Sequence, residues 1–326
     1  MGARTLTSMV RRVKVAVVGV GNNISALVQG IALHRATGSL VGIHRPVLDG
    51  LGVGDIDFVA AFATSAEKVG RDLTEAIFLP PNNFPRLTNE LPRTGVIVRR
   101  GLTDATEVER VGRELAGAEV VLYAAPSGRP ETALAYAEAS LCAGAAFINT
   151  TSDAVARDRQ WLDRFAAAGL PLLGDDLTSQ FGTSVVHHAL LRLLQERGLT
   201  LISSYQVNLG GTEDFRNLVE NTNTKLQSKR NALAADGSPA DRVQVAPLGY
   251  LPLLNSHKVA HINIEAKAWG ETSVSLDVKL QVQDPSGAAG VTIDLIRMAA
   301  SALRQRRAGY LTEAAPLLKS PPGTSV

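Results

Sequence analysis

The sequence predicts an α/β protein with a Rossmann-like, doubly wound parallel sheet, followed by a sheet of another kind. In the first two-thirds of the 326 residues, short apolar runs alternate with helical segments, as strands buried on both faces require. From about residue 200, apolar and polar residues alternate with period two, which is typical of an antiparallel sheet with one wetted face. A pair of glycines directly after the first apolar run adds a nucleotide-binding signal.

The expected strands can be read in chain order. The apolar runs of the first part are VKVAVVGVG (13–21), DIDFVAAFA (55–63), AEVVLYAAP (118–126), GAAFINTT (144–151) and LPLLGDD (170–176). The period-two runs are TLISSYQVNLGG (200–211), HKVAHINIEAKAWG (257–270) and TSVSLDVKLQVQD (272–284). A strong helix is expected over 287–307, with its start signalled by Asp284, Pro285 and Ser286. The polar, turn-rich stretch 224–243 suggests a mobile segment.

Composition restricts the class of partner. The chain is 45% apolar and 20% charged, which is ordinary for a soluble globular protein and excludes disorder as the main state. Lysine and arginine total 33 against 31 acids, so the net charge of +2 gives no electrostatic reason to expect a nucleic-acid or membrane partner. The single cysteine, Cys142, allows no internal disulfide and is expected to be a buried thiol. No stretch approaches the roughly 18 apolar residues needed to cross a bilayer, so a cytoplasmic protein is the simplest expectation.

The glycine pair stands in the context that a dinucleotide fingerprint needs. Gly19 and Gly21 follow a buried strand and precede an apolar helix over 23–36, so the backbone can approach a pyrophosphate at the helix N-terminus. The third glycine of the usual pattern is Ile24 here, while Asn22 and Asn23 can supply extra donors. The alternative is a plain turn between strand and helix.

The adenosine-ribose position is less typical. Dinucleotide-binding folds usually have an acidic residue at the end of the second strand. This chain has Ala63 at that position, and Thr64, Ser65 or Lys68 can take the place of the acid. A 2′-phosphate is less repelled without a carboxylate, so the sequence predicts the class of cofactor more firmly than the choice between NAD and NADP. Pro126, at the end of the third apolar run, is a further cofactor-binding candidate.

A second candidate anion site lies at the head of the long apolar helix in DDLTSQFGTSVVHHALLRLL. Free amides and the helix dipole at such a position favour a phosphate, and an ordinary N-cap followed by a core helix is the alternative. The candidate phosphate ligands are Ser179, Gln180, Gly182 and Thr183. His187 and His188 follow within the helix, and we interpret them as packing residues because adjacent helix positions point in different directions and form a poor metal site.

Longer stretches then point to a family. VGVGNN, GDDLTSQFGTSVVHHAL, QVNLGGTEDFRNL, HKVAHINIEAKAWG and LLKSPP occur in an order that resembles the inositol-phosphate synthases of the short bacterial type, over about residues 13–322. The resemblance implies an NAD-binding domain of residues 1–200 and 288–326, and an inserted α+β catalytic and oligomerisation domain of residues 201–287. It also implies a homotetramer that acts on a small sugar phosphate.

The resemblance further implies a redox-neutral cyclisation with a tightly bound NAD. The cofactor takes hydride from C5 of an open-chain hexose 6-phosphate, C6 attacks the C1 aldehyde as an enolate, and NADH then reduces the ketone. Ammonium groups aimed at the developing oxyanions stabilise them. The matching residues are Lys229, Lys258 and Lys319, with Asp284 as an orienting acid, Asp176 near the nicotinamide and Lys279 in a less defined role. Lys229 and Lys258 are expected in loops, and Lys279 can simply mark a wetted strand face.

Three departures from the family pattern leave the substrate open. Leu233 replaces a second lysine of the motif around Lys229, Thr178 replaces a lysine before the phosphate segment, and Ala63 replaces the ribose carboxylate. The enzyme can be an inositol-phosphate synthase in which Arg230 or another donor compensates, a cyclase that forms a five-membered ring from fructose 6-phosphate, or a protein that has lost activity. Retention of the other matching residues argues against the last. An NADH-releasing dehydrogenase and a non-catalytic nucleotide sensor are the alternatives from other classes.

Overall fold

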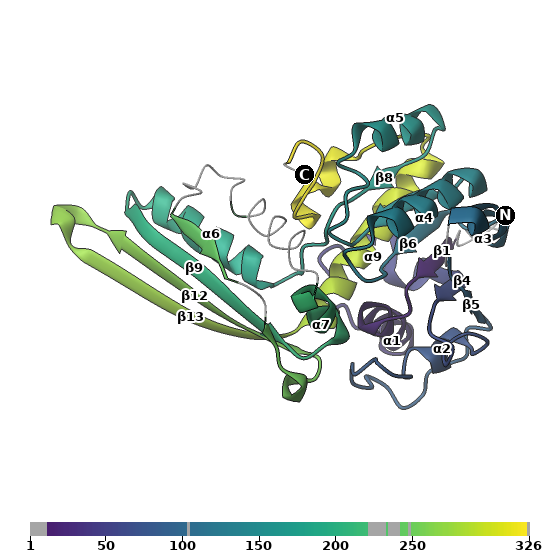
Figure 1. The fold of residues 1–326 in the computed structure, drawn as a ribbon, viewed down its shortest axis with the longest axis horizontal. Helices are drawn as coiled ribbons and strands as arrows, with labels where there is room; N and C mark the ends of the chain where they lie inside the picture. Colours follow the sequence, from purple (N-terminus) through teal and green to yellow (C-terminus); the bar gives the residue numbers. More distant parts are fainter. Residues whose placement is uncertain (1–11, 103–104, 221–232, 234–241, 247–248, 325–326) are drawn as a thin grey trace, which may run out of the picture.

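The computed structural model of the protein describes residues 12–102, 105–220, 233, 242–246 and 249–324. It confirms the predicted fold class: a six-stranded parallel sheet forms one part, and a separate sheet extends away from it (Figure 1). The predicted strands are all present, each within its predicted run. The strands that the sequence did not predict are short and contain no long apolar run. An example is Val98–Arg100, with the sequence VRR.

The parallel sheet has the strand order of a dinucleotide-binding fold. In chain order its members are the third, second, first, fourth, fifth and sixth strands, so the order reverses beside the first strand. From edge to edge they are β5 (Val98–Arg100), β4 (Ile56–Ala63), β1 (Val13–Val18), β6 (Val120–Tyr123), β7 (Ala146–Asn149) and β8 (Leu172–Leu173). Val18, the last residue of β1, pairs with Phe62 on one side and Tyr123 on the other. The carboxyl ends of β1, β4 and β6 therefore meet at the switch point where such sheets bind ligands.

Helices cover both faces of this sheet because its strands are apolar on both. Val13, Val15 and Val17 face one layer, whereas Ala16 and Val18 face the other. The first layer contains α1 (Asn22–Thr37) and α9 (Asp284–Arg304), and the second contains α3 (Val108–Glu114), α4 (Pro130–Ala143) and α5 (Arg159–Ala167). Helix α9, near the C-terminal end of the chain, thus covers one face of the parallel sheet together with α1. The short helix α2 (Leu73–Ala76) and the ribbon of β2 (Val47–Leu48) with β3 (Leu51–Gly52) lie beside the first layer.

The prediction for Cys142 is wrong. The thiol lies on α4 but is exposed. The helix buries Ala133, Tyr136 and Ala137 against the sheet, and Cys142 falls outside that buried face. The apolar run around it is rich in alanine, which is compatible with either face, so the pattern did not define the buried side.

The second sheet is built on a long antiparallel centre. β12 (His257–Lys267) pairs antiparallel with both β9 (Thr200–Gly210) and β13 (Ser273–Gln283), and β9 carries the short parallel strands β10 (Val243–Val245) and β11 (Gly249–Tyr250). Helix α6 (Thr183–Glu196) packs on one face, where Leu191 joins a cluster with Ile262 and Ile264. Helix α6 therefore packs with the second sheet, and the domain boundary expected after residue 200 stays a prediction.

Hydrogen bonds and a direct chain connection join the two parts around the switch point. Asn83 donates from its side chain to the carbonyl oxygen of Gly211 (3.0 Å). Asn217, on helix α7 (Glu213–Glu220), donates to the carbonyl oxygen of Ser127 (2.9 Å). In addition, α9 follows directly on β13, so the chain itself joins the two parts. These contacts leave a hollow between the two parts, and that hollow is the candidate site.

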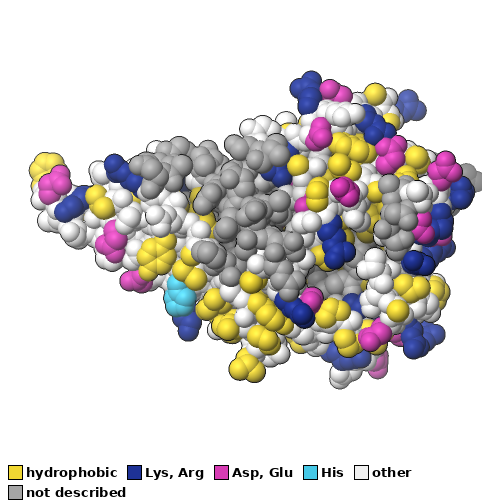
Figure 2. Space-filling model, viewed as in Figure 1, with side chains coloured by type: hydrophobic (Ala, Val, Ile, Leu, Met, Phe, Trp, Pro, Cys, Tyr) yellow, Lys and Arg dark blue, Asp and Glu magenta, His cyan; other side chains and the backbone are white. Residues whose placement is uncertain are grey.

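The visible surface shows no concentration of one charge sign. Lysine and arginine side chains alternate with acidic ones over the nucleotide-binding part (Figure 2). A helix long and apolar enough to span a membrane is absent from the residues that the structure describes.

Candidate active site

One cavity of about 460 Å³ lies at the switch point, between the ends of β1, β4 and β6 and the elements α6, β9, α7 and β12. The structure brings most of the predicted site residues to it, although their roles stay predictions. Those that line it are Gly19, Gly21, Asn22, Asn23, Ser65, Pro126, Asp176, Ser179, Gly182, Thr183, Lys258, Asp284 and Lys319. They come from both parts of the molecule, so the cavity exists only where the two parts meet.

The two glycines of the loop serve different purposes. Gly19 has φ +88°, and a Cβ there would lie 2.6 Å from the carbonyl oxygen of Ala124, so only glycine fits between β1 and β6. A Cβ at Gly21 would meet nothing within 4 Å, because the residue faces open space. Gly21 is also the N-cap of α1, and neither a side-chain cap nor an acidic residue occupies that end of the helix. The bare helix N-terminus therefore suits a pyrophosphate.

Asn22 has another role than the extra donor expected from the sequence. Its Oδ1 accepts from the backbone N–H groups of Asn83 and Phe84, both at 2.9 Å, and its Nδ2 donates to Asn83 Oδ1. The side chain thus ties the 82–84 segment to the start of α1. Asn23 is exposed at the cavity.

The loop after β4 carries a buried lysine. Lys68 is 4% exposed, and its Nζ donates to the carbonyl oxygen of Val20 (2.7 Å) and to Asn82 Oδ1 (2.9 Å). Desolvation lowers the pKa of Lys68 to about 8, while Glu67 opposes the shift. Ala63 and Ser65 line the same end of the cavity.

On the opposite wall, Asp176 and Lys319 form a buried ion pair. Lys319 Nζ lies 3.0 Å from Asp176 Oδ1 and donates to the carbonyl oxygen of Leu177 (2.6 Å). The backbone N–H of Lys319 also donates to the carbonyl oxygen of Asp176 (2.7 Å). The C-terminal segment is therefore attached to the 175–177 segment at the wall of the cavity.

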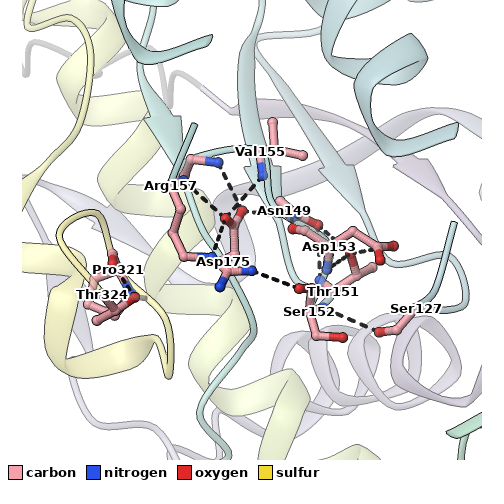
Figure 3. Close-up of polar contacts among 11 residues, drawn as sticks. Ser127, Asn149, Thr151, Ser152, Asp153, Val155, Arg157, Asp175, Pro321 and Thr324 are labelled. Carbon is pink, nitrogen blue, oxygen red and sulfur yellow. Dashed lines mark hydrogen bonds and ion pairs between the residues drawn. The ribbon is translucent and has the colours of Figure 1, made fainter. Parts of the chain in front are cut away.

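A polar network is centred on Asp175, the residue before Asp176 (Figure 3). Asp175 is fully buried, and its carboxylate accepts from Asn149 Nδ2 (2.7 Å), from the backbone of Val155 (3.0 Å) and from Arg157 Nε (3.2 Å). Burial raises the pKa of Asp175 despite these donors. Its backbone exchanges hydrogen bonds with Ser320, which lies next to Lys319. In the sequence Asp175 is only part of a predicted strand, so its role in holding the segment around Asp176 was not predicted.

Lys258 and Asp284 form the second ion pair of the cavity. The expectation that Lys258 lies in a loop is wrong: it is the second residue of β12, pairs with Gly210 and Val282, and is 9% exposed. Asp284 begins α9. A Cβ at Gly182 would lie 3.7 Å from Lys258 Nζ, so the ammonium stands beside the N-terminus of α6.

The predicted phosphate segment is only partly in the cavity. Gly182 caps α6 without a side-chain acceptor, which leaves the helix N-terminus open toward Lys258. Ser179 fits closely over α9, where a Cβ at Gly287 would meet its Oγ at 2.3 Å. Gln180 points elsewhere: its side chain packs on Gly290 and donates to the carbonyl oxygen of Gly42. Its side chain is therefore committed to structure, contrary to the sequence expectation.

Unpartnered polar atoms mark the second wall of the cavity. Thr183 Oγ1 and both amide atoms of Asn208 are buried without a hydrogen-bond partner in the described structure, and both residues line the cavity. Buried polar groups are almost always paired, so these atoms fit a polar ligand. The sequence missed Asn208, although a signal exists: the buried face of β9 carries Ser204, Gln206 and Asn208 where a core strand would be apolar.

His187 lies deeper along the same face. It contacts Gln206 Oε1 (3.2 Å) and Ser204 Oγ (2.6 Å), and desolvation lowers its pKa to about 4, so the ring is neutral. Its interpretation as a packing residue is confirmed. In the described part of the chain, no group of three or more His, Cys, Asp or Glu is placed to hold a metal.

Two further residues that the structure describes, Lys279 and Leu233, lie outside the cavity lining. Lys279 is exposed on β13 opposite His261, as the wetted-face alternative has it. Lys229, and most of the stretch expected to be mobile, lie outside the described residues. Leu233 is described, and it is 3% exposed within the apolar cluster of α6 and β12.

Comparisons with known proteins point to one family. Residues 182–285 match the family model for myo-inositol-1-phosphate synthase. The chain is 36% identical to inositol-3-phosphate synthase of Mycolicibacterium smegmatis over 95% of this chain and 93% of the relative, and 34% identical to that of Corynebacterium glutamicum with the same coverage. The crystal structure of Ari2 is 49% identical and superposes with a TM-score of 0.86 over 96% of this chain and 93% of that one. A myo-inositol-1-phosphate synthase-related protein from Thermotoga maritima, 22% identical, shares the fold with a TM-score of 0.78 over 95% and 93% of the two chains.

Proposed function

The chain belongs to the inositol-3-phosphate synthase family, and from this premise we propose that it cyclises a hexose 6-phosphate, with glucose 6-phosphate as the first candidate, to a cyclitol phosphate. One observation carries the proposal. Two lysines, Lys258 and Lys319, are each paired with a carboxylate on the wall of a single cavity that also holds an uncapped helix N-terminus and a glycine loop. A cyclisation that develops negative charge at two oxygens needs this combination.

We propose NAD as the cofactor. The open space at Gly21 and the uncapped start of α1 fit a dinucleotide pyrophosphate, and Asn23, Ser65 and Pro126 line the path on either side. When bound, the nicotinamide would supply the acceptance and return of hydride that a redox-neutral reaction needs. The Asp175 network would hold Asp176 and Lys319 in position at that end of the cavity.

The substrate phosphate would lie at the N-terminus of α6. Ser179, Gly182 and Thr183 line this corner, and Lys258 stands beside it. The unpartnered hydroxyl of Thr183 and the unpartnered amide of Asn208 would be satisfied by phosphate oxygens and sugar hydroxyls. Buried donors without partners cost free energy, and a ligand that pairs with them recovers it.

Lys258 and Lys319 would stabilise the oxyanions of the reaction. Each ammonium is mostly buried, so its attraction to a nearby negative oxygen is weakly screened. Asp284 and Asp176 would hold the two ammonium groups in position at the cavity wall. Lys229 would add a third cation, as the family resemblance implies.

The test is to incubate the purified protein with NAD and either glucose 6-phosphate or fructose 6-phosphate. We expect a cyclitol phosphate by NMR without net NADH absorbance, because the hydride returns to the product. NADH that accumulates in proportion to substrate would identify a simple dehydrogenase instead. Tight NAD binding without turnover of either sugar would identify a nucleotide sensor.

A second substrate is favoured by the position of Leu233. The family pattern has a lysine there, whereas this chain buries the isobutyl group of Leu233 in the apolar cluster of α6 and β12. In fructose 6-phosphate the carbonyl is at C2, so attack by C6 closes a five-membered ring and places the developing charge elsewhere. A carbocycle of five carbons in the NMR assay would establish this alternative.

We also propose a homotetramer, on family membership alone. Light scattering on the purified protein would then give four times the chain mass of 34.5 kDa. A monomer or dimer at micromolar concentration would contradict it.

A further inference from the structure

The contact between helix α6 and strand β9 is polar near the cavity. Along the rest of its length α6 packs on the second sheet through apolar side chains. Near its N-terminus it carries Thr183 and His187, which lie one turn apart on the same face. The buried face of β9 carries Ser204, Gln206 and Asn208 at alternate positions. These five residues, each at most 3% exposed, form what we call the polar seam.

The polar seam extends from the cavity into the interior of the protein. Thr183 and Asn208 line the cavity, whereas the other three residues do not. Hydrogen bonds of the His187 ring connect the helix to the strand, since its two nitrogens contact Gln206 and Ser204. A histidine between two neutral polar side chains can exist as either of two tautomers, so the partners decide which ring nitrogen carries the proton.

The hydrogen bonds at Ser204 have one possible direction. The carbonyl oxygen of Asn263 can only accept, so the hydroxyl proton of Ser204 is donated to it (2.6 Å). Ser204 Oγ therefore accepts from His187 Nε2, which lies 2.6 Å away. Desolvation lowers the pKa of His187 to about 4, so the ring is neutral and Nε2 carries its only N–H proton. The opposite ring nitrogen, Nδ1, is then a bare acceptor.

The bare Nδ1 determines the orientation of Gln206. Gln206 Oε1, 3.2 Å from Nδ1, cannot bond it, because both atoms are acceptors. Gln206 Nε2, in contrast, is buried without a partner in the described structure. The two atoms of an amide exchange places when the group turns over, and the hydrogen bonds decide between the orientations. With the amide turned, Nε2 donates to His187 Nδ1, and the chain of donors runs from Gln206 through His187 and Ser204 to the backbone of β12.

We propose that His187 is a positioning residue for the sugar-phosphate site, held as the Nε2–H tautomer so that it fixes the N-terminal turns of α6 against the buried face of β9. The hydroxyl of Thr183 and the amide of Asn208 belong to these same two elements, so the bonds of His187 set the distance at which both face a ligand. A wall that is free to shift presents its donors at the wrong distance and binds less tightly. The proposal rests on the proposed function, because it takes the ligand at this wall to be the sugar phosphate.

The tautomer is tested by 15N NMR of protein labelled at its six histidines. The signals of His187 are assigned by their loss in His187→Gln. We expect a protonated Nε2 and a bare Nδ1 at neutral pH. A protonated Nδ1, or a ring with both nitrogens protonated, would overturn the inference. This measurement needs no substrate, so its result is independent of the proposed function.

The positioning role is tested with Ser204→Ala, which removes the acceptor that fixes the tautomer but does not alter the cavity lining. The Nδ1–H tautomer should become populated, and KM for the sugar phosphate should rise about three- to tenfold, the range of one neutral hydrogen bond. The kcat and the Kd for NADH should stay unchanged. Ser203→Ala is the matched control, because it removes a neighbouring hydroxyl from the exposed face of the same strand and should have no effect.

Variants of the histidine itself complete the test. His187→Leu removes both bonds and should raise KM at least as much as Ser204→Ala, whereas His187→Gln keeps a donor for Ser204 and should recover part of the loss. Melting temperatures identify any variant that fails to fold. An unchanged KM in Ser204→Ala despite a changed tautomer, or an equal rise in Ser203→Ala, would contradict the positioning role. If the wild type binds neither glucose 6-phosphate nor fructose 6-phosphate, the proposed function fails and the positioning role with it, while the NMR spectrum still decides the tautomer.

Discussion

The two ends of the cavity offer anions different kinds of donor. At the nucleotide end the main donors are backbone: Gly21 presents an uncapped helix start, and glycine at this point keeps the space open. At the other end the donors are side chains, because Lys258 and Lys319 are each fixed by a carboxylate and project from elements that meet only in the fold. Backbone donors suit a cofactor that stays bound, whereas lysine side chains suit negative charge that develops on the substrate during the reaction.

The difference also affects how each end tolerates change. A backbone site is altered only by adding atoms, since no side chain carries the binding. A lysine site is altered by removing one charge, because the partner carboxylate then loses its cation in a mostly buried position. Substitutions at the two ends should therefore separate binding of the dinucleotide from the rate of reaction.

The largest effect is expected from Lys258→Met. Loss of one oxyanion donor costs roughly 10²–10³ in rate, so kcat should fall by about that factor while the Kd for NADH stays unchanged. Steady-state kinetics and a dinucleotide titration measure the two quantities. Lys267→Met is the matched control, because it removes a lysine from the other end of the same strand, where its ammonium contacts only the carbonyl oxygen of Glu271 among the described residues. A rise in KM at constant kcat would instead assign Lys258 to binding of the substrate phosphate alone.

The contrast between the two ends also explains what the sequence could predict. The glycine loop, the alternating strands and α9 follow from periodicity and turn chemistry, which are local properties. Lys258 and Asp284 are 26 positions apart and meet because β12 and β13 are paired antiparallel, so their contact depends on register rather than on a local pattern. Only the family resemblance pointed to them.

Other sequence predictions failed because they also depended on contacts between residues far apart in the chain. Gln180 stands in the predicted phosphate segment, but its side chain bonds Gly42, a residue far away in the chain. Asn208 was missed because the polar residues of an alternating strand are expected on its wetted face, whereas the structure buries the face that carries Ser204, Gln206 and Asn208. The packing of α6 on the second sheet likewise could not be seen in its own sequence.

The nucleotide end is tested by comparing its two glycines. Gly21→Ala should leave the melting temperature unchanged, because its φ of −94° is allowed and its Cβ has space, but should weaken NADH binding by about tenfold as the methyl group enters the pyrophosphate path. Gly19→Ala should instead destabilise the fold by about 1–3 kcal/mol, since a positive φ and a close backbone contact oppose any side chain. Thermal unfolding and NADH titration separate the two. Equal loss of stability in both variants would show that Gly21 also serves packing rather than ligand access.

The smallest effect is expected at Asn208, which belongs to the substrate end but carries no charge. Asn208→Ala removes one donor and one acceptor from the cavity wall, so KM for the sugar phosphate should rise about three- to tenfold, consistent with a neutral hydrogen bond of about 1 kcal/mol. The kcat and the Kd for NADH should change little. Asn208→Asp separates the two functions of the amide, because it keeps the acceptors but repels a phosphate, and should raise KM further. If Asn208→Ala lowers kcat as strongly as Lys258→Met does, the amide contacts the reacting oxygens. In that case neutral side chains as well as lysines stabilise the charge that develops during the reaction, and the proposed difference between the two ends of the cavity fails.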